Sequence, residues 1–354
     1  MPNGPSCAHC SIVPPELLRR IAVRGTPQQR DAALDTLAVD QTLRLGRATY
    51  QLLEAGLHRG LPGITTEGPQ RSVYDAGGRE ALPGRLVRAE GGAPVRDVDA
   101  NEAYDGLGAT FALFAEVYDR NSIDDEGMHL DASVHYGRRY DNAFWNGRQM
   151  VFGDGDGDLF NRFTISLDVI AHELTHGVTG DEARLVYLGQ AGALNESISD
   201  VFGSLVKQYV RRETAAQADW LIGAGLFTTN VHGVALRSMK APGTAFDDPV
   251  LGRDPQPSTM AGYVRTSADN GGVHTNSGIP NHAFYLTATA LGGYAWEKAG
   301  RIWYETLRDK RVKPTATFRQ FARCTAQNAA QYFGTVERQA VEAAWAAVGV
   351  KAGS

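Results

Sequence analysis

The chain has 354 residues, of which 43% are hydrophobic and 21% are charged, and its formal net charge at pH 7 is −5. This length allows two domains with separate hydrophobic cores, and the composition is typical of a globular protein. The small negative charge gives no reason to expect nucleic acid or an anionic membrane as a partner.

The sequence indicates neither a membrane span nor a secretory leader. No apolar run approaches the ~18 residues that a transmembrane helix needs, and the N-terminus lacks the apolar core of a signal peptide. The three cysteines, Cys7, Cys10 and Cys324, are too few for a disulfide framework. We therefore expect a protein made in the cytoplasm that stays there or is exported by a route other than Sec.

The N-terminal segment predicts two helices followed by a linker. Pro14-Pro15 fits an extended stretch that leads into a first helix, because proline is accepted in a first turn, and Thr26-Pro27 begins a second helix. Glycine and proline then accumulate between residues 56 and 69, which predicts a linker open to proteolysis. The expected division of the chain is a segment 1–60, a domain 61–190 and a domain 191–354.

Strands are predicted in the next part of the chain. Residues 72–79 and 84–88 predict a hairpin, residues 99–119 have the apolar period of a helix, and strands are expected at 134–136 and 149–152. The acidic run 154–158 resembles the beginning of an EF-hand calcium loop. Because Leu159 and Ile165 stand where that loop needs a glycine and a carboxylate, we predict a turn instead.

The sequence His172-Glu173-Leu174-Thr175-His176 follows, within an apolar pattern of helical spacing. Residues four apart lie on one face of a helix, so His172 and His176 can offer two imidazoles to one zinc ion. Glu173 can then reach a metal-bound water, whose pKa zinc lowers towards neutrality. Chance is the alternative explanation for this motif taken alone.

Further polar residues could complete this candidate site. A catalytic zinc needs a third protein ligand, and Glu196 lies at the start of the next strong helix. Asp200 follows one helical turn later and could accept the free ring N–H of a zinc-bound histidine. The alternative is that both acids only complement the start of the helix. His274 lies in a glycine-rich loop, where it could donate to the oxyanion of a tetrahedral intermediate, with Asp269 orienting it.

After residue 190 the chain is mostly helical in pattern. An apolar stripe predicts a helix over residues 194–209, and further helices are expected at 280–291, 296–308, 315–332 and 336–347. Residues 223–278 form a long region with little periodicity, and such regions in a compact protein are often functional.

These motifs together resemble the thermolysin family of zinc metallopeptidases. The resemblance runs from about residue 71 to Val350 and rests on the segments 142–147, 153–157, 172–176, 192–196, 236–239 and 269–278. Several independent motifs in family order are more specific than the histidine motif alone. The resemblance implies an α+β fold with a β-rich N-terminal domain, a zinc helix at the domain junction and a mainly α-helical C-terminal domain, preceded by a short helical prosegment.

The resemblance also implies a role for each matched residue. One catalytic zinc ion would be held by His172, His176 and Glu196, with Glu173 as the general base. Stabilisation of the oxyanion or orientation of the histidines would fall to His274, Tyr187, Asp269 and Asp200. The substrate would be bound by Asn142, Ala143, Arg237, Phe160, Phe163, Val169 and Leu236. The matched pocket is apolar, which implies a neutral endopeptidase that cleaves before bulky hydrophobic residues.

Residues 10–20 are similar to the short propeptide of the protealysin-like branch of this family. This similarity implies a zymogen whose N-terminal segment inhibits the enzyme within the same molecule. Cys7 or Cys10 could also cap the zinc as a thiolate, although a cysteine near an N-terminus more often has no such role. The implied partners are peptide or protein substrates, and the implied state is a monomer.

One departure from the family concerns calcium. Asp168 and Asp219 match positions of the family's paired calcium site, but Lys207, Leu221 and Ala224 replace three of its acids. Lys207 could pair with Asp168 and supply the positive charge of the ion. We therefore predict little or no calcium dependence at this site.

Two other functions stay open at this point. The first is a non-catalytic binding protein of the same fold, which is weakened because each matched catalytic position carries a competent residue. The second is a zinc hydrolase of non-peptide substrates. Arg237 and Asn142 argue against it, because they match positions that bind a peptide backbone.

Overall fold

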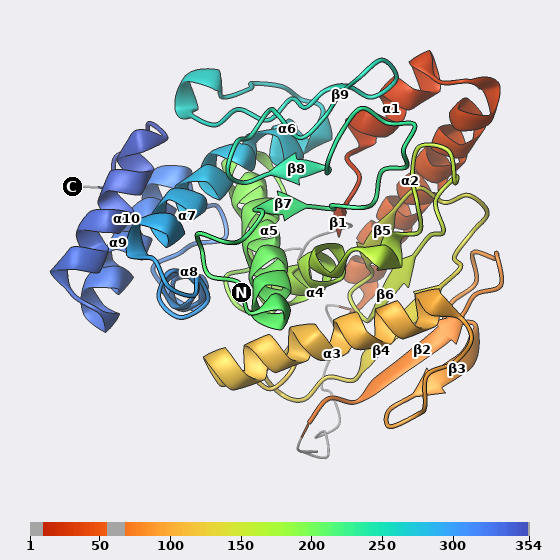
Figure 1. The fold of residues 1–354 in the computed structure, drawn as a ribbon, viewed down its shortest axis with the longest axis horizontal. Helices are drawn as coiled ribbons and strands as arrows, with labels where there is room; N and C mark the ends of the chain where they lie inside the picture. Colours follow the sequence, from red (N-terminus) through yellow and green to blue (C-terminus); the bar gives the residue numbers. More distant parts are fainter. Residues whose placement is uncertain (1–9, 55–67, 353–354) are drawn as a thin grey trace.

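The structure, a computed structural model, describes residues 10–54 and 68–352. A mixed β-sheet with helix α3 (Val98–Tyr118) lies on one side of the molecule, a bundle of helices lies on the other, and helices α4 (Leu167–Asp181) and α5 (Gly189–Arg211) lie between them (Figure 1). The N-terminal helices α1 and α2 pack beside the sheet. This arrangement is the α+β architecture that the sequence predicts.

The sheet has six strands in the order β1-β5-β6-β4-β2-β3. Strands β2 and β3 form the predicted antiparallel hairpin, β4 runs parallel to both β2 and β6, and β5 is antiparallel to β6 and β1. The bounds are β1 Cys10–Ser11, β2 Arg71–Asp75, β3 Arg85–Ala89, β4 Leu130–Val134, β5 Ala143–Trp145 and β6 Gln149–Phe152.

The strand predicted at residues 134–136 is wrong in its position. Strand β4 ends at Val134, because His135 takes a left-handed backbone conformation with φ of 55° that interrupts the ladder. The acidic run that follows β6 is a turn, as predicted. One carboxylate oxygen of Asp156 accepts the backbone N–H groups of Asp158, Leu159 and Phe160.

Helix α3, Val98–Tyr118, crosses the sheet and packs against α4, Leu167–Asp181. It begins where the side chain of Asp97 accepts two backbone N–H groups, which is the usual role of an aspartate N-cap. Gly106 allows the close approach to α4, since a Cβ there would lie 2.5 Å from the side chain of Ile170. The predicted helix over 99–119 is confirmed.

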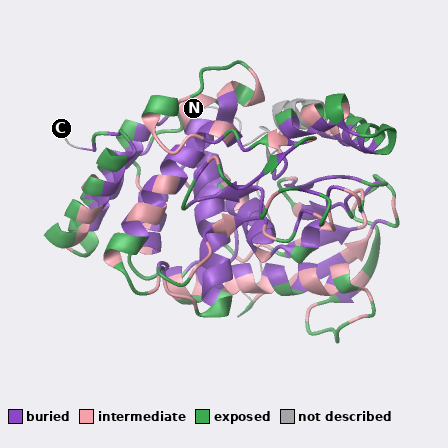
Figure 2. Ribbon diagram, turned by 45° about the horizontal axis from the view of Figure 1, so that its top comes forward, coloured by how far each residue is buried: buried purple, intermediate pink, exposed green. Residues whose placement is uncertain are grey.

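Helices α4 and α5, Gly189–Arg211, form the centre of the molecule. They are drawn almost entirely as buried in Figure 2. A Cβ at Gly203 would meet the backbone of α4 at 2.5 Å, so this glycine lets the two helices pack closely. The residues of the histidine motif and those of the next helix are therefore brought together at this contact.

The C-terminal part is helical, as predicted, and its helices are α6 Asp269–Asn276, α7 Gly278–Leu291, α8 Ala299–Leu307, α9 Phe318–Tyr332 and α10 Thr335–Ala347. Thr317 and Gln320 form a capping box at the start of α9. The region 223–278 contains short elements: β8 Arg237–Ser238, which pairs with the preceding β7 Leu221–Ile222, the pair β9 Asp247–Asp248 and β10 Gly252–Arg253, and a 3-10 turn at Met260–Gly262. Another 3-10 turn, Phe163–Ile165, directly precedes α4.

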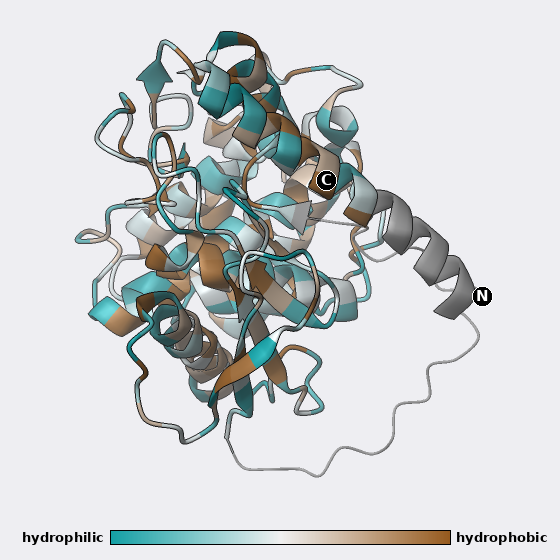
Figure 3. Cartoon of the chain, turned by 90° about the vertical axis from the view of Figure 1, so that its right-hand side faces the viewer, coloured by the Kyte–Doolittle hydropathy of each residue, from teal (hydrophilic) through white to brown (hydrophobic). Residues whose placement is uncertain are grey.

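The N-terminal segment consists of β1, α1 Pro15–Arg24 and α2 Pro27–Glu54, and both predicted helices are confirmed. Leu17, Leu18 and Ile21 of α1 belong to the same buried cluster as the core of the two domains. Hydrophobic segments gather inside the molecule and hydrophilic ones at its periphery (Figure 3). Most of the predicted linker at 56–69, and Cys7, lie outside the described residues. Among the helices of the described part, none is long and apolar enough to cross a membrane.

Candidate active site

The two histidines of α4 face each other through their Nε2 atoms, which are 3.1 Å apart. The Nδ1 atom of His172 lies 2.8 Å from a carboxylate oxygen of Asp200, which can only accept a hydrogen bond. The Nδ1 atom of His176 lies 2.8 Å from the amide oxygen of Asn195, whose NH₂ group donates to the carbonyl of Leu185. Both Nδ1 atoms therefore carry the proton, and two Nε2 lone pairs point at one place.

Glu196 of α5 adds a carboxylate at the same place. Its oxygens lie 3.5 Å from the Nε2 atoms of His172 and His176, and its Oε2 atom is buried without a hydrogen-bond donor among the described residues. Two lone pairs and a buried carboxylate repel one another unless a cation lies between them. Two imidazoles with one carboxylate are a common ligand set of catalytic zinc, so the residues fit this ion.

The histidine ligands are held by a buried network that extends beyond α4. Asp200 accepts hydrogen bonds of 2.9 Å from both Nε and Nη2 of Arg237, and one of 2.8 Å from the amide of Asn281. Burial opposes the charge of Asp200, but Arg237 and His172 outweigh it and lower the pKa of this carboxyl. Asp200 is thus a fixed anion that keeps the ring of His172 in one orientation.

Glu173 is fully buried beside this centre. Its Oε2 atom accepts the backbone N–H of Trp145 at 3.0 Å, and its Oε1 atom has no donor among the described residues. Burial, together with the nearby charge of Glu196, raises the pKa of Glu173 well above its ordinary value. A carboxylate in this setting has a free oxygen that can accept a proton.

His274 comes from helix α6 and lies 3.4 Å from Glu196 through its Nε2 atom. The structure corrects its predicted position in a loop: it lies in the helical turn of α6, just after the left-handed residues 270–272 that bring the turn to the site. Asp269 lies 2.8 Å from Nδ1 and also accepts the backbone N–H of His274. Burial lowers the pKa of His274, but Asp269 and Glu196 outweigh this effect and raise it to about 9. Tyr187 lies 3.2 Å from its Nε2 atom and also donates to Glu196.

The residues predicted to bind the backbone of a substrate form hydrogen bonds with the chain's own N-terminal segment. The amide of Asn142 accepts the N–H of Val13 at 2.9 Å and donates to its carbonyl at 3.3 Å. The carbonyl of Ala143 accepts the N–H of Ile12 at 3.2 Å, and Arg237 donates to the carbonyl of Ile12 at 3.1 Å. Residues 10–13 thus lie along the edge strand β5 as an added strand.

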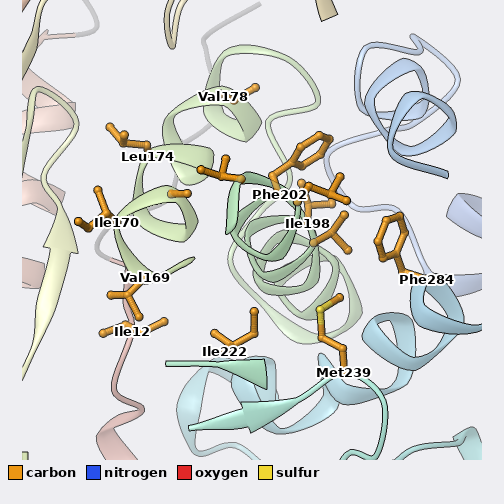
Figure 4. Packing of buried hydrophobic residues seen from close by; sticks show 14 of the residues in the cluster. Ile12, Val169, Ile170, Leu174, Val178, Ile198, Phe202, Ile222, Met239 and Phe284 are labelled. Atoms are coloured by element: carbon orange, nitrogen blue, oxygen red, sulfur yellow. The ribbon is translucent and has the colours of Figure 1, made fainter. Parts of the chain in front are cut away.

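The four residues predicted to line an apolar pocket are all buried. Ile12 is completely buried in one cluster with the four predicted lining residues, Phe160, Phe163, Val169 and Leu236. Its side chain lies directly beside Val169 of α4 (Figure 4). The structure therefore brings together the polar residues that the sequence singled out for the site, and the role of the apolar lining residues stays a prediction.

Sequence reasoning missed several residues of the site. Asn195 and Ser199 lie at 2.8 and 3.1 Å from Nδ1 of His176, and Asn281 completes the shell of Asp200. Asn195 directly precedes Glu196, so helical periodicity could have placed it near the ligands. Asn281 comes from α7, and the sequence carried no signal for its contact with α5.

Lys207, which replaces an acid of the family's paired calcium site, is paired as expected. The ammonium group of Lys207 lies 2.8 Å from Asp168 and 2.8 Å from Asp219, and it donates to the carbonyl of Leu221 at 2.6 Å. It thereby occupies a place between two carboxylates and a carbonyl oxygen, which are the ligands that calcium prefers. Calcium binding itself stays a prediction.

Three parts of the chain match known protein families. Residues 10–38 match the protealysin propeptide, residues 49–180 match the catalytic domain of thermolysin metallopeptidases, and residues 183–350 match their α-helical domain. An extracellular metalloprotease of Pectobacterium carotovorum subsp. carotovorum is 55% identical over 346 residues, which are 97% of this chain and 96% of that protein. Protease PrtS of Photorhabdus sp. (strain Az29) is 47% identical over 342 residues, 96% of this chain and 92% of that protein.

A solved structure gives the same answer. The precursor of protealysin, a metalloproteinase from Serratia proteamaculans, superimposes with a TM-score of 0.88 at 54% sequence identity, covering 96% of this chain and 99% of that one. The predicted resemblance, fold and short propeptide are confirmed. The chain belongs to the thermolysin family of metalloendopeptidases and carries a propeptide of the protealysin type.

Proposed function

We propose that this chain is the zymogen of a zinc-dependent neutral endopeptidase that cleaves on the N-terminal side of bulky hydrophobic residues. One observation carries the proposal: an extended peptide, residues 11–13, lies across the candidate metal site with the side chain of its isoleucine completely buried. Each backbone polar group of Ile12 is hydrogen-bonded, and its side chain is buried among aromatic and aliphatic residues. A substrate residue of similar size and polarity would gain the same contacts.

His172, His176 and Glu196 would hold the one zinc ion of this enzyme. When bound, the ion would polarise the peptide carbonyl and lower the pKa of a water molecule. Glu173 would take the proton of that water through its free Oε1 atom and pass it to the leaving nitrogen. His274 and Tyr187 would donate to the developing oxyanion, while Asp269 and Asp200 hold the imidazoles in place.

The N-terminal segment would keep the enzyme inactive by occupying this cleft. We propose residues 1–60 as the inhibitory propeptide, 61–190 as the first catalytic domain and 191–354 as the second, in a molecule that acts as a monomer. The salt bridges of Lys207 support little or no calcium dependence at the site that they fill.

The activity is tested by incubating the purified full-length protein with zinc, beside a Glu173→Gln variant. We expect the wild type to lose its N-terminal segment, by intact mass, while hydrolysis of an added peptide begins. The variant should stay intact, because it lacks the group that accepts the proton.

Specificity is tested on the processed wild type with peptides that differ at one position. Leucine or phenylalanine after the cleaved bond should be preferred to glycine by at least about tenfold in kcat/KM, since each buried methylene contributes to binding. Equal hydrolysis of the peptides would contradict the proposed pocket. Processed wild-type protein that cleaves no peptide would contradict the endopeptidase itself.

A further inference from the structure

We propose that the Ser11–Ile12 peptide bond is the first bond that this enzyme hydrolyses, in its own chain, and that the shortened prosegment stays bound as a product-like inhibitor. This inference rests on the proposed function. It adds a cleavage site within the inhibitory segment and an inhibited intermediate between the zymogen and the active enzyme.

The register of the N-terminal strand places the Ser11–Ile12 peptide bond at the candidate active site. Strand β1 is antiparallel to β5, with Cys10 opposite Trp145 and Ser11 opposite Phe144. The carbonyl oxygen of Ser11 lies 3.1 Å from Nε2 of His274, the group proposed to stabilise an oxyanion. This is therefore the carbonyl that faces the reacting groups.

The neighbouring bonds are held away from these groups. The carbonyl of Ile12 is engaged by Arg237 at 3.1 Å, and the carbonyl of Val13 by the amide of Asn142 at 3.3 Å. Contacts of this kind on the C-terminal side fix the register, because a shift by one residue would turn Ile12 out of its pocket. Ser11–Ile12 is the bond presented for attack.

The reaction itself is an ordinary hydrolysis. One water molecule is consumed, the C–N bond between Ser11 and Ile12 breaks, Ser11 gains a carboxylate and Ile12 gains an amino group. Glu173 can receive the proton of the water at Oε1 and return it to the nitrogen of Ile12. Trp145 keeps Glu173 in position through its backbone N–H, and it belongs to the strand that pairs with the prosegment.

Several anchors of the described part of the prosegment lie after the proposed cleavage point. Arg20 donates to the carbonyls of Leu251 and Arg253 at 3.3 and 3.2 Å, and Gln29 donates to Asp158 at 2.8 Å. Further along α2, Thr36 and Asp40 are hydrogen-bonded to residues 140–142, next to the cleft. Loss of residues 1–11 would leave these contacts and the buried Ile12 unchanged, so the shortened chain should remain inhibited.

The rigid Pro14-Pro15 pair supports the same conclusion. Both φ angles are fixed by the rings, and Pro14 already has the extended conformation that leads from the strand into α1. A new N-terminus at Ile12 would therefore lose little conformational entropy when it binds, so the shortened prosegment should stay bound in the cleft.

The test follows the intact mass of the full-length protein at early times after zinc is added, at two protein concentrations. We expect a species that begins at Ile12 to form first, at a rate independent of protein concentration, as an intramolecular reaction requires. Ile12→Ala should slow this step at least about tenfold, because the pocket loses its apolar anchor. Val23→Ala, a change at an exposed position of the same segment, should leave the rate unchanged.

The Glu173→Gln zymogen should keep residues 1–11 even when processed wild-type enzyme is added, since its bond lies buried in its own cleft. The species that begins at Ile12 should hydrolyse no added peptide until the rest of the prosegment is removed. If the released prosegment fragments still carry residues 1–11, the Ser11–Ile12 bond is not cleaved first and the proposal is wrong. If a species that begins at Ile12 hydrolyses added peptide, the proposed inhibition by the shortened prosegment is wrong. Hydrolysis of added peptides by the processed enzyme tests the proposed function separately. If it is observed, the proposed function stands even when either of these two results contradicts the further inference.

Discussion

The two histidines of the site are held by acceptors of different charge. His172 donates to the carboxylate of Asp200, whereas His176 donates to the neutral amide of Asn195. The charge of Asp200 is balanced by the two hydrogen bonds from Arg237. The neutral acceptor avoids another buried anion close to Glu173 and Glu196, where it would increase their repulsion.

Substitution of Asn195 by alanine should weaken zinc binding. The Nδ1 proton of His176 would lose the acceptor that fixes its tautomer, and such outer partners typically contribute about 10–100-fold to metal affinity. The affinity can be measured by competition with a chelator, in the Glu173→Gln background that keeps the chain intact. Asn328→Ala removes a buried, hydrogen-bonded asparagine that contacts Thr306 instead of the site, and it should leave zinc affinity unchanged. Equal affinity in both variants would contradict this role for Asn195.

At the scale of elements, the central contact between α4 and α5 combines apolar packing with one buried ion pair. Asp168 lies in the first turn of α4, and its carboxylate meets Lys207 from the last part of α5. Burial lowers the pKa of Lys207, but Asp168 and Asp219 outweigh it and raise the pKa, so the ammonium stays charged. The pair also reaches β7 through the carbonyl of Leu221.

Replacement of Lys207 by methionine should cost about 3–5 kcal/mol of unfolding free energy, because Asp168 would be left as a buried charge without its cation. Urea unfolding of the Glu173→Gln protein and of its double variant measures this difference. Lys298→Met breaks a surface pair with Glu337 and should cost far less, because solvent screens that pair. We also expect added calcium to leave the midpoint of the protein with Lys207 unchanged. Similar losses in the two lysine variants would contradict a structural role for Lys207.

At the scale of the whole molecule, the prosegment packs against Asp141 of the catalytic domain, whose carboxyl group is buried. The backbone N–H of Asp141 donates to Thr36 of α2, and both carboxylate oxygens of Asp141 are buried without a donor among the described residues. Burial, reinforced by the charge of Asp156 and only partly opposed by the nearby backbone N–H of Asp156 and by Arg139, raises the pKa of Asp141 well above its ordinary value. Asp40 of α2 adds a second carboxyl beside residues 140 and 142.

Docking of the prosegment should therefore weaken as the pH rises. Because the covered Asp141 has the higher pKa, the docked state binds the proton more tightly. The stabilisation is complete below the ordinary aspartate pKa and is lost as the pH rises towards the raised value. Through this window the free energy of opening α2 should fall by up to about 1.4 kcal/mol per pH unit. Hydrogen exchange of the α2 amides in the Glu173→Gln protein measures it.

Asp141→Asn is the matched control for this prediction, because it keeps the size of the side chain and removes its titration. The difference between the two pH profiles isolates the contribution of Asp141 from that of the rest of the interface. Profiles that run parallel would show that Asp141 keeps the same pKa when the prosegment opens.

Much of this molecule could be predicted from local sequence. The helices at 99–119 and in the C-terminal part follow from their apolar periods, and the ligand pair follows from the four-residue spacing of His172 and His176 on one helical face. The prediction for strand β4 was displaced, because the left-handed backbone at His135 is not visible in a pattern of side chains. His274 was expected in a loop, since residues 270–272 hide the helical turn that follows them.

By itself, the sequence determined the chemistry, because ligand type, spacing and the order of the motifs are local properties of the chain. Only the tertiary structure decided which groups hold Asp200 in place, since Asn281 donates to it across 81 positions of the sequence. It also decided the register of the N-terminal strand against β5. These two features depend on packing between segments that are distant in the sequence. The side-chain pattern of a single helix or strand does not show which distant segment it will contact.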